Sequence, residues 1–475
     1  MHRMRTRGRF YLAALLLSVL ACGKEEGPLV PEPEAPTGIS FSPELVVVAQ
    51  AGGEYQLTVT APSRPRISGE PDWITVRDGT YKDYSITYIL KVDANVAGER
   101  TASLSVTAGT LTKAVVVSQE GFSIPEVDKT RISAVPVNPK AGDPARKLYS
   151  FLLDSYGKKT LSGVQSAHSH TNDYVDAVAA ATGKHPALAG YDFIFLQFSP
   201  TPPGWSWVRD YTDISAQKEH WNAGGVISYM WHWNVPKDEE SYRSHNTDNY
   251  DFYLDRTPFD IREAVKEGTW QHEFILEDID KMAETLKLLQ AEGIPVLFRP
   301  LHEAAGNYTR YNPNGGAWFW WGRYGAEPCK QLWNLLQDRL QGYHGLDNLL
   351  WVWTMDVMEG YEREAAQWYP GDDRVDIIGF DVYAENTAAK PAQFAFLQEV
   401  TGGRKILTIS ECGNVPSPEA NFAAGAPFSW FMVWNTTFEN DAIDLQGFPL
   451  NTMDYWKSLM NSDLVYTREN MPLLK

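Results

Sequence analysis

The spacing of hydrophobic and polar residues changes about a quarter of the way along the chain. Between residues 38 and 121, apolar and polar positions alternate with a period of two, as in Tyr55 to Thr60, Tyr84 to Val92 and Ala102 to Val106. Alternation of this kind is typical of strands with one buried face, and the segment has no run with helical spacing. We therefore expect about seven short strands that form a small all-β sandwich.

From residue 135 to 475, helical and strand-like patterns take turns. Asp143 and Pro144 suit the cap and first turn of a helix, and a second helical pattern runs from Leu276 to Leu289. The apolar runs expected as strands are Thr160 to Val164, Ala187 to Gly190, Val226 to Met230, Val296 to Phe298, Leu349 to Trp353, Val375 to Ile378, Ile406 to Ile409 and Trp430 to Val433. Eight strands joined by helices predict an α/β domain of the (β/α)8 TIM-barrel class.

The N-terminal residues carry a pattern for export. Residues 1–21 combine an arginine-rich start with an apolar run that is short for a membrane span, which is typical of a signal peptide. Cys22 follows a small residue, as in a lipoprotein cleavage box, and residues 22–37 form a Pro- and Glu-rich tether. We expect lipidation of Cys22 and a cell-surface outer-membrane lipoprotein; cleavage nearby with Cys22 incidental is the alternative.

Composition narrows the classes of partner and cofactor. The formal net charge is −18, which argues against binding to nucleic acid, because phosphate recognition needs a basic surface. Beyond Cys22 there are two cysteines, Cys329 and Cys412, so no disulfide framework is expected. We expect no cofactor and no bound metal. His168, His170, Asn172 and Asp173 are the one candidate metal cluster, but their spacing on a loop favours a solvated or sugar-contacting role.

The alternating segment resembles a known module. The run Pro71 to Val76, the Asn95 to Arg100 turn and the closing run Val115 to Gln119 are similar to a BACON domain, which often precedes polysaccharide-degrading domains. Trp73 is the only tryptophan in this segment. It could stack on a sugar, but its place at the start of a strand favours packing in the core. We expect the module to act as a spacer.

Two glutamates follow the fourth and the seventh of the expected strands. Glu303 and Glu411 would both lie at the C-terminal mouth of the barrel, where the loops converge. Two carboxyl groups about 5 Å apart are what a retaining glycoside hydrolase requires, one as acid and base and one as nucleophile. A lone glutamate after a strand is usually a solvated surface group. Here Arg299 should be buried and needs an anionic partner, which favours a site.

Sequence motifs around these glutamates carry a second resemblance. Arg299 to Glu303, followed by the run Trp318 to Gly322, resembles the acid/base signature of glycoside hydrolase family 26, most of whose members are β-mannanases. The runs Ser228 to Pro236 and Gly379 to Tyr383 are similar to the same family. The sequence departs from the family pattern between Ala304 and Ala317, where it is longer, and this loop should border the cleft.

The family resemblance implies a role for each matched residue. It makes Glu303 the acid/base and Glu411 the nucleophile, and it implies that Tyr383 hydrogen-bonds the nucleophile. It also implies that the substrate is bound by His232, His302, Trp318 and Trp434. Independently of it, the aromatic run beside Glu303 could favour the protonated acid by desolvation. Tryptophans alone prove little, because Trp351, Trp353 and Trp430 lie inside strand runs and should be core.

The activity expected from these observations is retaining hydrolysis of β-1,4-mannosidic bonds in mannan-type polysaccharides. Two alternatives remain open at this point. The same two carboxyls would serve a β-1,3-xylanase or a mixed-linkage β-glucanase, and a barrel that has lost hydrolysis would act as a surface glycan-binding protein.

Overall fold

The computed structural model describes residues 34–50, 52–95, 98–121, 124–166, 171–200, 210–306, 317–356, 365–434 and 444–475. Two compact units make up the chain, Met1–Phe122 and Ser123–Lys475, and each has its own hydrophobic core. The predicted signal, the lipidation at Cys22 and most of the tether lie outside the described residues. None of the described helices is long and apolar enough to cross a lipid bilayer.

The first unit is a β-sandwich of two four-stranded sheets, with strand orders β1-β3-β6-β5 and β2-β8-β7-β4. Its strands are β1 (Ser40–Ser42), β2 (Leu45–Val48), β3 (Gly53–Thr60), β4 (Arg66–Ser68), β5 (Ile74–Arg77), β6 (Ser85–Val92), β7 (Arg100–Ala108) and β8 (Leu111–Gln119). Alternate residues point inward, such as Ile86, Tyr88 and Leu90 on β6, which are all buried. The predicted sandwich is confirmed, with eight strands where about seven were expected.

Trp73 belongs to the packing of this sandwich. Its indole is partly buried against the core, and the guanidinium of Arg100 lies 4.3 Å from the centre of its ring. A cation over an aromatic face stabilises the ring in place. The core interpretation of Trp73 is therefore favoured over a sugar platform.

The second unit is a closed barrel of eight parallel strands, as the sequence predicts. The hydrogen-bonded order is β9-β10-β11-β14-β15-β16-β17-β18, and β9 also pairs with β10, which closes the ring. The strands are β9 (Thr160–Gln165), β10 (Leu188–Asp192), β11 (Val226–Met230), β14 (Val296–Arg299), β15 (Leu349–Asp356), β16 (Ile377–Val382), β17 (Ile406–Cys412) and β18 (Trp430–Val433).

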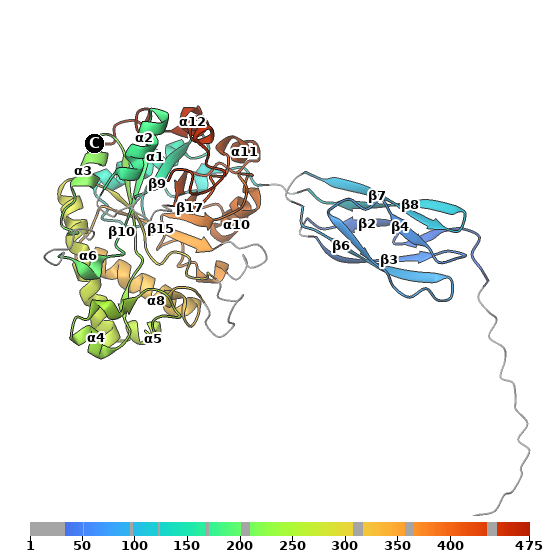
Figure 1. The fold of residues 1–475 in the computed structure, drawn as a ribbon, viewed down its shortest axis with the longest axis horizontal. Helices are drawn as coiled ribbons and strands as arrows, with labels where there is room; N and C mark the ends of the chain where they lie inside the picture. Colours follow the sequence, from blue (N-terminus) through green and yellow to red (C-terminus); the bar gives the residue numbers. More distant parts are fainter. Residues whose placement is uncertain are drawn as a thin grey trace, which may run out of the picture. The chain divides into compact units, whose positions relative to one another are not determined.

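Helices surround these strands (Figure 1). They are α1 (Asp143–Ser155), α2 (Asp173–Thr182), α3 (Ser215–Asn222), α4 (Glu239–Arg243), α5 (Ile261–Ala264), α6 (Trp270–Ala291), α8 (Ala326–Gln337), α10 (Pro391–Thr401), α11 (Pro418–Ala423) and α12 (Met453–Asn461). The predicted helix 276–289 is the central part of α6, whose first turn is capped by the side chain of Thr269. Its residues Ile279, Met282 and Leu286 are buried at helical spacing.

Some details of the predicted elements are wrong. The N-cap of α1 is Gly142, and Asp143 is instead the first helical residue, where a negative charge favours the helix dipole. The strands β16 and β17 continue past their apolar runs to Val382 and Cys412. Glu411 therefore lies on its strand and not after it. Polar residues at strand ends cannot be distinguished from loop residues by hydrophobic pattern alone.

Buried tryptophans pack between the barrel strands and the surrounding helices: the ring centre of Trp333 on α8 lies 5.3 Å from that of Trp351 and 5.1 Å from that of Trp353. Trp351, Trp353 and Trp430 are almost completely inaccessible, which confirms them as core residues. Cys329 and Cys412 are both free and buried. Stability of the unit therefore rests on apolar burial.

Candidate active site

The segment after β14 places Glu303 at the mouth of the barrel. Leu301 and Glu303 both have backbone φ angles in the left-handed region, +51° and +52°, on either side of His302. Non-glycine residues in this region carry a conformational cost and cluster at functional sites. The turn sends the His302 and Glu303 side chains in directions that a regular strand continuation would not allow.

An irregularity between β16 and β17 sets the second carboxyl in place. Phe380 pairs with Ile409, but the next residue, Asp381, pairs with Glu411, so Ser410 is the extra residue of a β-bulge. Bulges re-aim side chains next to active sites. Here the bulge brings Asp381 and Glu411 side by side on neighbouring strands, where a regular register would pair Asp381 with Ser410.

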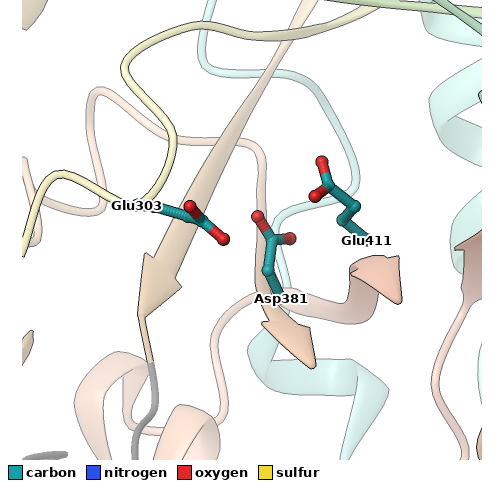
Figure 2. A group of neighbouring side chains, drawn as sticks. All are labelled: Glu303, Asp381 and Glu411. Atoms are coloured by element: carbon teal, nitrogen blue, oxygen red, sulfur yellow. The ribbon is translucent and has the colours of Figure 1, made fainter. Parts of the chain in front are cut away.

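Three carboxyl groups meet at this point. One oxygen from each of Glu303, Asp381 and Glu411 lies within 4.8 Å of the others. Figure 2 shows Asp381 between the two glutamates, with the three groups turned toward a common space. An approach this close fits the short carboxyl spacing of a retaining glycoside hydrolase.

Arg299 neutralises part of this charge. It is 4% exposed, and its Nη1 donates to both oxygens of Asp381, at 3.2 and 2.9 Å. Its Nη2 donates to Oε2 of Glu411 at 2.5 Å. The predicted burial of Arg299 beside an anionic partner is confirmed, and there are two such partners. Burial lowers the pKa of the guanidinium, but Asp381 and Glu411 outweigh this and raise it, so it stays charged.

One guanidinium cannot balance three carboxylates. Burial raises the pKa of Asp381 to about 8, and the charge of Glu411 adds to this, although Arg299 and a hydrogen bond with Glu303 act in the opposite direction. The cluster therefore retains a proton at neutral pH. A group of three carboxyls can in general hold a cation, and here Arg299 already supplies positive charge to two of the three, Asp381 and Glu411.

Tyr383 approaches the same cluster from the end of β16. Its hydroxyl donates a hydrogen bond to Oε1 of Glu411, while the residue as a whole is 48% exposed. Burial of the hydroxyl and the charges of Glu411 and Glu303 raise the pKa of Tyr383 well above its ordinary value. The phenol therefore remains a donor. Gly413 leaves room for the ring, because a Cβ there would lie 3.1 Å from it.

His232 comes just after β11 and lies on a second side of the site. Its Nδ1 lies 2.6 Å from Oδ2 of Asp192, and its backbone N–H donates to Oδ1 of the same carboxylate at 2.9 Å. This pairing places the proton on Nδ1 and leaves Nε2 for another partner. The imidazole centre lies 4.7 Å from that of His302 and 5.6 Å from the ring of Trp434.

An aromatic wall supports His302. The imidazole is buried, and this burial, with the charges of His232 and Arg299, lowers the pKa of His302 well below its ordinary value, so the ring is neutral. Its centre lies 5.2 Å from the ring of Phe319. Trp321 stacks on Phe319 at 4.4 Å and donates from its indole to the carbonyl of His302. The expected apolar surroundings next to Glu303 are present.

Trp318 is held beside Glu303 by the backbone of Gly306. The Gly306 N–H donates to the carbonyl of Glu303 at 2.8 Å, and the Trp318 N–H donates to the carbonyl of Gly306 at 3.1 Å. A Cβ at position 306 would lie 2.6 Å from the indole, so this close approach requires glycine. The inserted part of this loop, 307–316, lies outside the described residues.

The structure thus gathers the residues that the sequence singled out: Glu303, Glu411, His232, His302, Trp318, Tyr383 and Trp434. It adds Asp381, Asp192 and Phe252, whose ring centre lies 4.9 Å from that of His232. Asp381 lies in the run Gly379 to Tyr383, and Asp192 is the last residue of β10. Their position at the ends of strands could have pointed to a role in the site, but the residues that they contact are far away in the sequence.

The candidate metal cluster is only partly described. His168 and His170 lie outside the described residues. Asn172 accepts from the hydroxyl of Tyr191 at 2.6 Å and donates to the carbonyl of Ala216 at 2.9 Å. These buried hydrogen bonds give Asn172 a structural role.

The comparison with known families agrees with this geometry. Residues 137–448, which are more than half of the chain, match the sequence model of glycosyl hydrolase family 26. The chain belongs to this family. Residues 66–120 match the BACON model, described as a putative binding domain. The family 26 match spans every strand of the barrel and both glutamates.

Curated relatives include two mannan endo-1,4-beta-mannosidases. One is a mannan endo-1,4-beta-mannosidase of Thermothelomyces thermophilus, 36% identical over 339 residues, which are 70% of this chain and 62% of that protein. The other is the mannan endo-1,4-beta-mannosidase B of Piromyces sp, 34% identical over 316 residues, covering 65% of this chain and 50% of that protein. The chain therefore spans between half and two thirds of the length of these relatives.

Solved family 26 structures cover the barrel. A beta-mannanase from a symbiotic protist of the termite Reticulitermes speratus, complexed with gluco-manno-oligosaccharide, is 36% identical, with a TM-score of 0.59 over 72% of this chain and 98% of that one. The family 26 domain of a Prevotella bryantii endo-beta-mannanase/endo-beta-glucanase is 33% identical, with a TM-score of 0.62 over 71% of this chain and 99% of that one.

Proposed function

We propose that the protein is a retaining mannan endo-1,4-β-mannosidase in which Glu411 is the nucleophile and Glu303 the acid and base. The observation that carries the proposal is the meeting of their carboxyl oxygens within 4.8 Å at the mouth of a family 26 barrel. The names of the curated relatives, which are mannan endo-1,4-beta-mannosidases, support the substrate.

In the first step, an oxygen of Glu411 forms a bond to the anomeric carbon as the bond from that carbon to the glycosidic oxygen breaks. Glu303 gives its proton to the departing oxygen, so the leaving chain separates as an alcohol. Arg299 and Tyr383 hydrogen-bond the two oxygens of Glu411 and orient it for attack.

In the second step, water replaces the leaving chain. Glu303, now ionised, takes a proton from the water as its oxygen attacks the anomeric carbon, and Glu411 departs as a carboxylate. One water is consumed, and two inversions give net retention of configuration. His232 is placed to hydrogen-bond the sugar at the cleavage point through Nε2, because Asp192 holds its other nitrogen.

A substrate panel with product analysis tests this function. The purified protein should release reducing sugar from mannan, galactomannan and glucomannan faster than from β-1,3-xylan or lichenan, and the first-formed anomer seen by proton NMR should be β. Preference for xylan or lichenan would instead favour the alternative activities. Binding without turnover, at a level equal to that of Glu411→Ala, would favour a glycan-binding protein.

We further propose lipid attachment at Cys22 and display at the cell surface. The support is the sequence alone, an arginine-rich start and apolar run that end at a small residue and cysteine, followed by an extended tether. Growth with labelled palmitate should label the native protein and not Cys22→Ser. Equal labelling of the two, or none in either, would contradict the anchor.

A further inference from the structure

The buried carboxyl group of Asp278 lies outside the cluster at the mouth and takes no part in the steps described above. Asp278 is in the middle of α6 and is 8% exposed, and its Oδ2 accepts a hydrogen bond from Nε1 of Trp233 at 2.7 Å. Aspartate is rarely buried to this extent unless a partner requires it there. The partner, Trp233, is fully buried and is the residue after His232. Asp278 is therefore connected to the active site through the Trp233 indole.

Trp233 contacts two sides of the active site. Its backbone continues directly from His232, which is placed to bind the sugar at the cleavage point. Its carbonyl accepts from Nε1 of Trp320 at 2.7 Å, and the two indole rings meet edge to face with centres 5.5 Å apart. Trp320 in turn packs edge to face on Trp321, which is part of the wall that supports His302. A change in the orientation of Trp233 would therefore shift both His232 and this wall.

The aromatic contacts of Trp233 do not by themselves fix the direction of its ring. The indole stacks on that of Trp231, with centres 3.8 Å apart and planes at 16°. Stacked rings can slide and turn in their plane, because packing between apolar surfaces is non-directional. A hydrogen bond is directional, and one to a charged acceptor is roughly twice as strong as one between neutral groups. The bond to Asp278 therefore sets the direction in which the N–H edge of Trp233 points.

We propose that Asp278 is a positioning residue, which orients Trp233 and through it His232 and the aromatic wall for catalysis. The proposal rests on the proposed function, because it concerns the same reaction. Asp278 lies on a helix outside the barrel and acts through Trp233. Its substitution should change the geometry of the site and leave both catalytic glutamates in place.

The charge of Asp278 can change within the pH range of ordinary enzyme assays. Burial raises the pKa of Asp278 to about 6, and the charge of Glu277 adds to this, although Lys281 and the Trp233 N–H act in the opposite direction. Protonation of the carboxylate would remove the charge from the acceptor and weaken the bond to Trp233. Above about pH 6 the bond is therefore the stronger, charged one.

A cavity of about 170 Å³ borders the Asp278 carboxyl group. A space of this size is large enough to admit water, which can carry protons to and from the carboxyl group. The other ionisable side chains that line the cavity, among the described residues, are Tyr242, His245, Tyr250, Glu277 and Lys281. Asp278 can therefore exchange its proton although it is buried.

The first measurement is the pH dependence of kcat/KM for mannopentaose. In the native protein, kcat/KM should fall roughly tenfold as the pH drops through about 6, because the neutral acceptor makes the weaker bond. This fall should be a step to a lower level and not a complete loss. Asp278→Asn keeps a neutral acceptor at every pH, so it should have the lower kcat/KM at neutral pH and lack the step. A step retained in Asp278→Asn would overturn the proposal.

The second measurement does not depend on activity. In protein containing isotope-labelled tryptophan, the indole N–H signal of Trp233 in the NMR spectrum is identified by its absence from Trp233→Phe. Its chemical shift should change with a midpoint at about pH 6 in the native protein and stay constant in Asp278→Asn. A signal that does not respond to pH in the native protein would contradict the proposal.

Asp280 provides a matched control on the same helix. Its carboxylate accepts from Arg339 at 2.7 and 2.6 Å and lies 2.7 Å from Nε2 of His344. Asp280→Asn should keep both the step in kcat/KM and the titration of the Trp233 signal. Loss of either would mean that the effect belongs to the helix as a whole, which would overturn the proposal. If the native protein cleaves no mannan oligosaccharide, the proposed function fails, and the Trp233 signal still tests the bond to Asp278.

Discussion

The surroundings of the two glutamates differ in kind. Glu411 is 5% exposed and lies on a strand, where Arg299 and Tyr383 donate hydrogen bonds to its two oxygens. These donors stabilise a negative charge and fix the orientation of the carboxylate. Glu303 follows a strand on a turn with left-handed backbone, beside the neutral His302 and the Phe319 and Trp321 rings.

This difference fits the two roles proposed for Glu411 and Glu303. A nucleophile needs a charged carboxylate in a fixed orientation, and an acid needs a proton and an apolar neighbourhood. Asp381 connects the two environments, because it shares Arg299 with Glu411 and a hydrogen bond with Glu303. Substitutions that remove one part of either environment should therefore lower the catalytic rate by different amounts.

Removal of the proposed nucleophile should have the largest effect. Glu411→Ala deletes the covalent step, and kcat should fall on the order of 10,000-fold or more for every substrate. Added azide should restore part of the turnover on an activated aryl β-mannoside and yield the α-azide, because a small anion can enter the space of the lost side chain. A β-configured azide, or full activity without azide, would contradict the assignment.

The loss of activity on removal of the proposed acid/base should depend on the substrate. Glu303→Ala should lower kcat on mannan about 100- to 10,000-fold, the usual contribution of general acid catalysis. The rate of the first step on a dinitrophenyl β-mannoside should fall much less, because that leaving group needs no proton. Burst kinetics would then show accumulation of the glycosyl-enzyme. Equal losses on both substrates would exclude Glu303 as the acid.

Removal of one hydrogen bond to Glu411 should have an intermediate effect. Tyr383→Phe keeps the half-exposed ring and removes the hydroxyl that donates to Oε1. A hydrogen bond to a charged group contributes about 1.5–3 kcal/mol, so kcat should fall roughly 10- to 100-fold with little change in KM. Tyr343→Phe, which changes an exposed tyrosine elsewhere, serves as the control. A change in KM alone would indicate a role in binding.

Much of this site could be predicted because its residues lie at or just after the ends of strands, in short sequence motifs. Period-two and helical patterns located the sandwich and all eight barrel strands, and barrel topology then implied that positions after strands four and seven converge. Asp381 was not singled out, because its pairing with Glu411 depends on a β-bulge at Ser410. Sequence pattern does not reveal a register shift of one residue.

The other omissions have the same physical origin. Asp192 ends β10 and His232 follows β11. The aspartate reaches the imidazole only because these two strands are neighbours in the barrel. Contacts between segments far apart in the chain are decided by tertiary packing, which local propensity does not encode.

Asp381→Asn should have the smallest effect on rate. It tests whether Asp381 connects the surroundings of Glu411 with those of Glu303. Burial raises the pKa of Asp381 to about 8, so the group titrates at mildly alkaline pH. The native pH profile of kcat/KM should contain a transition near this value, and the variant should lack it. At its optimum the variant should lose about tenfold, since Arg299 keeps an oxygen to bind.

The same substitution should change how stability depends on pH, and the sign follows from the direction of the shift. The folded protein holds the Asp381 proton up to about pH 8, whereas an unfolded aspartate releases it near pH 4. Between these values the folded state binds the extra proton, so the group makes the protein less stable as pH rises. Asp381→Asn should flatten the fall of Tm over this range. An unchanged slope would mean that Asp381 is ionised in the folded protein and that the proton of the cluster resides elsewhere.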